Sequence, residues 1–310
     1  MKKILILAAG LALSFSSCRI YDPLNEAGLV LTTEWSERSE GVTVPESYNV
    51  ELGDYSATHT EAAQKIDHPF TRDTYRLHIW NPTQGVKVDG TVVTVMDLEE
   101  EQEPQRRSLA DARENLAGMR ERRNLAGTRQ GEEYGGLLTG NIGWLFTSAM
   151  DADIQGGGAQ EIVAPMSQQV GELTFIIEPT GENADRIDGI AGTLTGAAKK
   201  LDFDTGKHSV SSEVQFDFEK NADGKWQAST RLLGVTGTSQ IMSVWIFFAE
   251  NRPDVIVLDS DMTETLAGFN TNKKTPVVLG TQIVETPSEA GFTSTIDNWE
   301  RIEREGITAE

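Results

Sequence analysis

The chain has 310 residues, an apolar fraction of 38% and a formal net charge of −21. This length is enough for two domains of ordinary size, and the composition gives no indication of global disorder. The acidic charge disfavours nucleic acid and anionic lipid headgroups as partners, because both are themselves negatively charged. After the N-terminus, no apolar run approaches the roughly 18 residues that a membrane-spanning helix requires.

The first 18 residues have the pattern of a lipoprotein export signal. Two lysines precede an apolar stretch at 4–15, and two serines lead directly into Cys18. As a helix this stretch spans about 18 Å, too little for a hydrocarbon core of roughly 30 Å, which favours a cleaved signal over an anchor helix. We therefore predict a lipoprotein signal peptide at 1–17, with Cys18 acylated as the first residue of the mature chain. The alternative is an ordinary signal peptide with an incidental cysteine.

Lipid on Cys18, palmitate included, would hold the protein to a membrane. Each buried methylene contributes about 0.8 kcal/mol to membrane binding, and several chains together make the attachment stable. Cys18 is the only cysteine in the sequence, which excludes an intrachain disulfide and a cysteine-based metal site. Residues 18–27 contain Pro23 and few apolar side chains, and we expect them to form a tether.

From residue 28 onward, apolar and polar residues alternate with the period of two that is typical of β-strands. Strands are predicted in the first half of the chain at 28–35, 48–52, 74–80, 86–96 and 144–149. In the second half they are predicted at 161–170, 172–178, 190–194, 214–219, 226–233, 242–249, 277–285 and 291–298. Asp89-Gly90 predicts a type I′ hairpin turn, and residues 221–224 predict another hairpin turn. One short helix is predicted at 260–269, where Asp261 and Glu264 resemble a capping box.

Strands at this spacing, with little helix, predict an all-β protein built from two tandem antiparallel β-sandwich domains. We expect the first sandwich at 28–165, the second at 166–300 and a charged tail at 301–310. Residues 97–136 interrupt the pattern with an acidic run, many arginines and a repeated Arg-x-Asn-Leu-Ala-Gly-x-Arg unit. We interpret them as a partly helical surface insertion in the first sandwich. A protease-sensitive loop and a partner helix remain alternatives.

No pattern in the sequence points to catalysis, a cofactor or a metal. The four histidines (His59, His68, His78 and His208) lack the spacing of metal ligands. The turn at 202–206 resembles a calcium loop but has no glutamate at the required distance downstream. A nucleophile elbow and a phosphate-binding loop are both missing from the sequence. Two glycosidase carboxylates brought together from distant positions are the remaining enzymatic alternative.

Two further patterns involve aromatic residues. His78 alternates with Arg76 and Trp80 in one predicted strand, so we expect all three on the same face. The six tryptophans are interpreted as core residues, and exposure of Trp80 or Trp245 would instead indicate a platform for stacking sugars.

Six segments carry a likeness to a known family: DTYRLHIWN (73–81), GWLFTSAMD (143–151), MSQQVGELTFIIEPTG (166–181), DRIDGIAGTLTG (185–196), DGKWQASTRLLGVTGT (223–238) and LDSDMTETLAGFNTNKKTPVVLG (258–280). In these segments the chain resembles the fimbrial anchor and minor-subunit lipoproteins of Bacteroidales, a family that includes members described only as a domain of unknown function. The likeness covers most of residues 28–299. None of the six motifs is catalytic, so the resemblance implies architecture more directly than activity.

The resemblance implies two transthyretin-like sandwiches, export as a lipoprotein and display on the outer membrane. It also implies fimbrial subunits as partners, bound by β-strand complementation, in which main-chain hydrogen bonds of an added strand give affinity. In structural members of the family an arginine-specific protease removes the first strand, whereas anchor subunits are thought to keep it. Here the candidate first strand is 28–35, and Arg38 follows it as the candidate processing site. The resemblance thus implies a fimbrial anchor or minor subunit that is not an enzyme, and a surface glycan-binding lipoprotein is the alternative.

Overall fold

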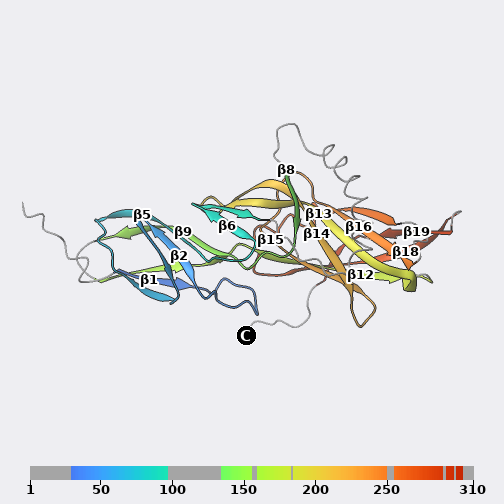
Figure 1. Cartoon of the computed structure of the whole chain (residues 1–310), viewed down its shortest axis with the longest axis horizontal. Coiled ribbons are helices and arrows are strands. Elements are labelled where there is room, and N and C mark those ends of the chain that lie inside the picture. The colour runs from blue at the N-terminus through green and yellow to red at the C-terminus, as the bar shows by residue number, and fades with distance from the viewer. Residues whose placement is uncertain are drawn as a thin grey trace, which may run out of the picture.

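The structure is a computed structural model that describes residues 29–96, 134–155, 159–182, 184–249, 255–288, 291–296 and 298–302. Within these ranges it is almost entirely β-structure, with a 3₁₀ turn, η2 (Ala184–Arg186), and no α-helix. The strands form two units that lie at opposite ends of an elongated molecule (Figure 1). The predicted signal peptide, tether and Cys18 lie outside the described residues, as do residues 97–133 of the predicted insertion and the tail from 303 onward.

The first unit consists of two sheets that enclose one core. Its three-stranded sheet has the order β10 (Gln160–Pro165), β1 (Leu29–Glu34), β4 (Ala63–Ile66). Its five-stranded sheet has the order β11 (Ser167–Gln168), β9 (Phe146–Ile154), β5 (Asp73–Trp80), β2 (Tyr48–Leu52), β3 (Tyr55–His59). Alternate residues of β1 and β2 point inward, so Leu31 and Val50 are buried in the same cluster. Burial of one face of each sheet therefore fixes the register of these strands.

The second unit is a 12-stranded sheet lined by one larger core. Its main path has the order β17 (Ile256–Asp261), β16 (Ile241–Phe248), β13 (Ile187–Asp202), β14 (Lys207–Lys220), β15 (Trp226–Leu232), β12 (Gly171–Thr180), β18 (Val277–Ser288), β19 (Gly291–Ile296). Beside this path, β6 (Val86–Asp89), β7 (Val92–Val95), β8 (Tyr134–Thr139) and β20 (Glu300–Arg301) pair with its members. Phe175 of β12 stacks on Phe216 of β14 with ring centroids 5.1 Å apart, so distant parts of the sheet face each other across the core.

The chain crosses between the two units more than once. Strands β6 to β8 belong by sequence to the stretch expected in the first sandwich, but β7 pairs with β13 and β8 pairs with β14. Val93 and Leu138 accordingly lie in the core of the second unit. Strand β8 begins at Tyr134, so the last three residues of the predicted insertion, 134–136, belong to a strand of this sheet.

Two local predictions are wrong. In the hairpin of β6 and β7, Asp89 pairs with Val92, so the turn consists of Gly90-Thr91. Only Gly90 has a positive φ, +58°, which fits a type II′ turn rather than the expected type I′ turn. The helix expected at 260–269 is also missing, because β17 extends to Asp261 and consecutive turns follow it.

The hydrogen bonds of residues 261–269 explain why turns, and not a helix, follow β17. Leu266 N donates to Met262 O over the four residues of an α-helix, but Ala267 N donates to Glu264 O and Phe269 N to Leu266 O over only three, so the α-helical turn does not continue. Asp261 Oδ1 still accepts from Thr263 N at 2.9 Å, so its capping role is local and does not by itself extend a helix. The tighter turns place Leu266 and Phe269 in the core of the second unit.

The burial of β1 leads to a stability prediction. Leu31→Ala should lower the free energy of unfolding by about 2–5 kcal/mol, because it leaves a cavity at a fully buried site. Urea denaturation followed by tryptophan fluorescence would measure the change. The matched control is Val163→Ala on the adjacent β10, where the side chain is exposed and we expect almost no effect. Equal losses for the two variants would contradict a buried first strand.

Candidate functional site

The first strand lies in the middle of its sheet. β1 runs parallel to β10, from Leu29 opposite Gln160 to Glu34 opposite Pro165. On its other side it is antiparallel to β4. Both of its hydrogen-bonding edges are therefore occupied, and removing β1 would leave a gap between β10 and β4.

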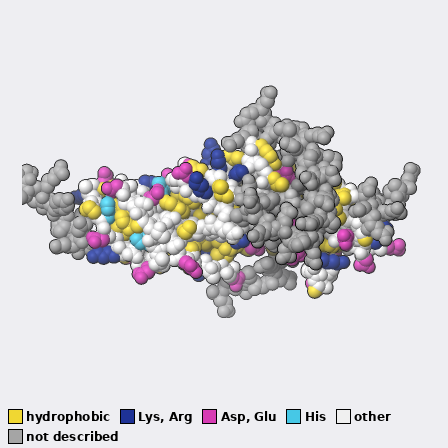
Figure 2. Space-filling view, in the orientation of Figure 1, with side chains coloured by type: hydrophobic (Ala, Val, Ile, Leu, Met, Phe, Trp, Pro, Cys, Tyr) yellow, Lys and Arg dark blue, Asp and Glu magenta, His cyan; other side chains and the backbone are white. Residues whose placement is uncertain are grey.

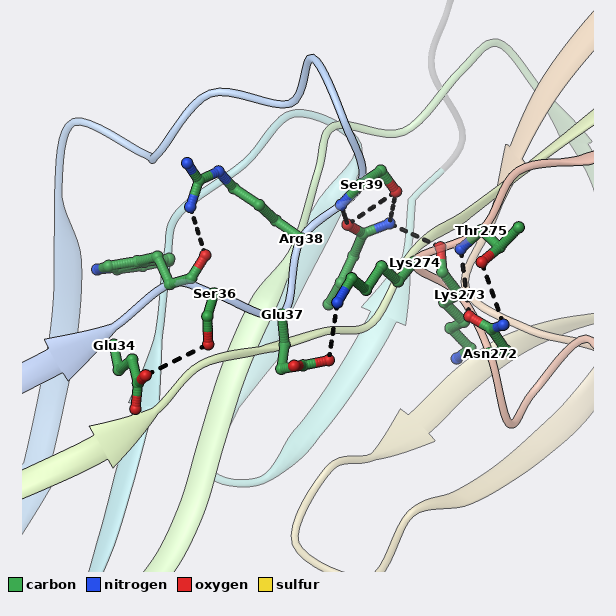
Figure 3. A network of polar contacts seen from close by, with 11 residues as sticks. Glu34, Ser36, Glu37, Arg38, Ser39, Asn272, Lys273, Lys274 and Thr275 are labelled. Atoms are coloured by element: carbon green, nitrogen blue, oxygen red, sulfur yellow. Dashed lines mark hydrogen bonds and ion pairs between the residues drawn. The ribbon is translucent and has the colours of Figure 1, made fainter. Parts of the chain in front are cut away.

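The segment after β1, residues 35–42, holds Arg38 within its own loop. Arg38 Nε donates to Val42 O at 3.1 Å, and Arg38 Nη1 donates to Trp35 O. Trp35 is itself buried, and its Nε1 donates to Thr33 Oγ1 at 2.9 Å. The arginine that the sequence identifies as a candidate processing site is thus half-buried and bonded to two backbone carbonyls of its own loop. Figure 3 shows one of these bonds as the dashed line from Arg38.

The next residue, Ser39, contacts a side chain 129 positions away in the sequence. Ser39 N donates to Gln168 Oε1 at 2.8 Å, and the hydroxyl of Ser39 contacts both ends of the same amide. Gln168 Nε2 also donates to Val170 O and to Lys273 O, each at 2.8 Å. Gln168, on β11, therefore joins the Arg38 loop, the segment between β11 and β12, and the loop that precedes β18. Figure 3 shows Ser39 and Lys273, the ends of two of these contacts.

Lys273, whose carbonyl Gln168 contacts, is a buried cation with only 6% of its surface exposed. Its Nζ donates to Gln169 O at 3.0 Å and to Leu233 O, and it lies 2.9 Å from His208 Nε2. No carboxylate of the described residues lies within ion-pair distance of this ammonium. Three acceptors match its three N–H groups, so the charge is held by hydrogen bonds alone.

Burial lowers the pKa values of both Lys273 and His208. Burial lowers the pKa of Lys273 to about 7. Burial, together with the nearby positive charge of Lys273, lowers the pKa of His208 to about 4. At neutral pH His208 is therefore uncharged and can accept a hydrogen bond from Lys273.

A second contact between the units starts from β5. Arg76, His78 and Trp80 point to one face of this strand, toward the turn between β13 and β14. Arg76 Nε donates to Asp204 Oδ1 of that turn at 2.9 Å, while the rings of His78 and Trp80 contact Phe203. The three side chains that the sequence predicts on one face of this strand thus face the second unit.

The turn that resembled a calcium loop is closed by its own hydrogen bonds. Asp202 Oδ1 accepts from Asp204 N at 3.1 Å, and Asp202 Oδ2 accepts from Thr205 Oγ1 at 2.9 Å. Across the described part of the chain, no group of three or more His, Cys, Asp and Glu residues is placed to hold a metal ion.

The tryptophans do not form an exposed platform. All six are described: Trp35, Trp226, Trp245 and Trp299 are buried, while Trp80 and Trp144 are half-buried. Acidic side chains occur toward both ends of the visible face (Figure 2). Within the described ranges, no helix is long and apolar enough to cross a membrane.

The described residues thus form an all-β protein of two sheet-built units, with its first strand held inside its own sheet. The family of fimbrillin-A associated anchor proteins Mfa1 and Mfa2 matches this sequence over residues 122–304, more than half of its length. The chain belongs to this family. No curated protein matches the sequence.

Solved structures share the fold at low sequence identity. A candidate adhesin from Bacteroides ovatus has a TM-score of 0.56 at 8% identity, covering 90% of this chain and 96% of its own. Another candidate adhesin from the same species has a TM-score of 0.54 at 13% identity, covering 87% and 92%. A protein from Bacteroides thetaiotaomicron, described as a candidate polysaccharide-binding protein (DUF1812), has a TM-score of 0.50 at 9% identity, covering 90% and 99%. These identities support a common fold alone.

The pKa of Lys273 predicts how stability depends on pH. Between pH 7 and 9 the folded protein releases the Lys273 proton, while the unfolded chain, with the ordinary pKa of 10.5, retains it. The free energy of unfolding should therefore rise with pH over this window, by about 2 kcal/mol from this group. Urea denaturation at several pH values would measure the rise. The variant Lys273→Met should lack this contribution, and the same rise in both proteins would contradict the assignment.

Proposed function

We propose that the protein is a lipoprotein of the outer-membrane surface that acts as a structural fimbrial anchor or minor subunit, attached through lipid on Cys18. Membership in the anchor family supports the fimbrial role, and the signal pattern at 1–18 supports the lipid. The two units correspond in this proposal to tandem transthyretin-like sandwiches at 28–165 and 166–300, except that β6 to β8 join the sheet of the second unit. The partners are fimbrial subunit proteins, and no catalytic role is assigned.

The observation that supports the anchor role is the position of β1 inside its sheet. The strand is paired on both edges, and the Arg38–Ser39 bond that follows it is held by Val42, Trp35 and Gln168. Proteolysis requires a segment to open locally before it can enter a protease. A subunit that keeps its first strand has no gap for the strand of a neighbour at this position, which suits the end of a polymer.

Binding of a partner by β-strand complementation requires a sheet edge that can accept another strand, and β17 is the edge that suits it. The main path of the second sheet ends at β17, which is paired with β16 and also lies close to β19, the strand at the other end of the path. Its residues alternate between half-buried and exposed, with Ile256 and Leu258 at the margin of the core and Val257 39% exposed. An added strand would extend the sheet through main-chain hydrogen bonds and cover this margin.

Membrane attachment is tested at Cys18. Cells expressing the wild-type protein and fed a fatty-acid probe should label it, and the protein should fractionate with membranes. Cys18→Ala should abolish both labelling and membrane association, because no other thiol can accept the lipid. Membrane association without labelling would contradict the lipid anchor.

The proposed edge is tested by a charge on β17. Val257→Lys should weaken binding to a purified fimbrial subunit by about tenfold, since lysine on an edge strand opposes the addition of another strand. The matched control is Val44→Lys, another exposed valine, which lies outside the strands. Calorimetry or biolayer interferometry would measure both. Equal affinity of the two variants and the wild type would place the partner elsewhere.

A further inference from the structure

Hydrogen bonds hold the residues on both sides of the Arg38–Ser39 peptide bond in place. Among these, the bond to the side chain of Gln168 connects the segment to a distant part of the chain. On the N-terminal side of the bond, the guanidinium of Arg38 is bonded to carbonyls of its own loop. On the C-terminal side, the Ser39 amide donates to Gln168 Oε1, and Ser39 is only 3% exposed. A protease must release both sides before the bond is extended in its active site.

Gln168 is in turn fixed from the second unit. Its Nε2 donates to the backbone carbonyl of Lys273, so the position of the amide depends on the loop that precedes β18. The side chain of Lys273 ties this loop to Gln169 O and Leu233 O. A series of buried hydrogen bonds thus connects the Arg38–Ser39 bond to the second unit. Breaking one of them leaves a buried polar group without a partner, which lowers the stability of the folded state.

We propose that Gln168 and Lys273 form a lock through which the second unit keeps the Arg38–Ser39 bond closed to proteases, and that acid opens this lock at His208. The inference deepens the proposed function, because cleavage of this bond is what would separate β1 from the rest of the first unit. The lock would regulate whether β1 stays attached to the rest of the chain.

The acid sensitivity follows from what surrounds His208. Its Nε2 lies 2.9 Å from Lys273 Nζ, so a proton on the ring places two cations side by side in a buried site. Leu233 O, 3.2 Å from the same nitrogen, favours the protonated ring, but it already accepts from Lys273 Nζ. The neighbouring amide of Asn270 is already bonded to both backbone groups of Val235 and carries no charge.

Other charged groups near the lock do not neutralise such a pair. Lys274, beside Lys273, contacts Glu37 at 3.5 Å on the exposed side of the Arg38 loop. Lys207, beside His208, is exposed and adds positive charge. Within the described ranges no carboxylate pairs with either His208 or Lys273. Protonation of His208 therefore pushes Lys273 away from the carbonyls that it holds.

Limited proteolysis at neutral pH tests the lock. Trypsin is added to the full-length protein, and mass spectrometry follows the cut between Arg38 and Ser39 apart from cuts at other arginines. Gln168→Ala should speed this cut by about tenfold, because it removes the acceptor of the Ser39 amide. The matched control is Gln169→Ala, which removes only the neighbouring side chain and its contact with Thr147 Oγ1. Equal cutting of Gln168→Ala and the wild type would overturn the lock.

Hydrogen exchange tests the acid step without relying on a destabilising variant. In the wild type, the protection factor of the Ser39 amide should fall by about tenfold between pH 7 and pH 4, while the amides of β12 keep theirs. His208→Gln, which keeps an acceptor but cannot take up a proton in this range, should abolish the fall. A protection factor that does not change with pH in the wild type, or that falls equally in His208→Gln, would overturn the role of His208.

These two measurements are separate from the tests of the proposed function. Both use the isolated protein and report on one peptide bond, whereas lipid labelling and subunit binding report on attachment and partners. A failed lock with intact binding would leave the anchor role in place, and a working lock without any fimbrial partner would contradict only the anchor role.

Discussion

The amide of Gln168 joins three segments that lie far apart in the sequence, and the relation between the two units depends on it. One side chain accepts from Ser39 and donates to the carbonyls of Val170 and Lys273. An amide can do this because it carries both an acceptor oxygen and two N–H donors on one rigid plane. Leaving a buried donor or acceptor of this amide without a partner costs more free energy than a single hydrogen bond contributes. Loss of one of the three segments therefore destabilises the contacts of the other two.

The second contact between the units has a different physical character. Arg76 and Asp204 meet at the surface, where solvent weakens ion pairs, whereas Phe203 packs against the rings of His78 and Trp80. The aromatic contact therefore carries more of the stability, and the ion pair mainly fixes direction. Together with the strands β6 to β8, which cross from one unit to the other, these contacts favour a stiff connection between two ends of an elongated molecule. Stiffness suits the anchor role that we propose.

A buried ammonium without a carboxylate is unusual for a structural protein, and it gives this junction a dependence on pH. Lys273 is satisfied by carbonyls and a neutral imidazole, which are weaker partners for a cation than a carboxylate. In our proposal, these contacts therefore hold only while His208 stays uncharged. The acidic charge of the chain as a whole does not change this, because the described carboxylates near the junction lie at the surface.

The sequence by itself determined most of the strands, because alternation of apolar and polar side chains is a local property of the chain. The ranges 48–52 and 74–80 reappear as β2 and β5, and the turn at 221–224 closes the hairpin of β14 and β15. The family resemblance, carried by local motifs, also held. Strands β3 and β4 were missed, since they are short and largely exposed and so lack a strong apolar pattern.

Only the tertiary structure decided which strands pair and which polar side chains meet. The parallel pairing of β1 with β10 and the passage of β6 to β8 into the second unit depend on hydrogen bonds between distant segments, which no local pattern encodes. The same is true of the site. Arg38 stood out as an arginine after a strand, but Gln168 and Lys273 gave no signal, because an amide or a lysine in a loop becomes a contact point only when the fold buries it.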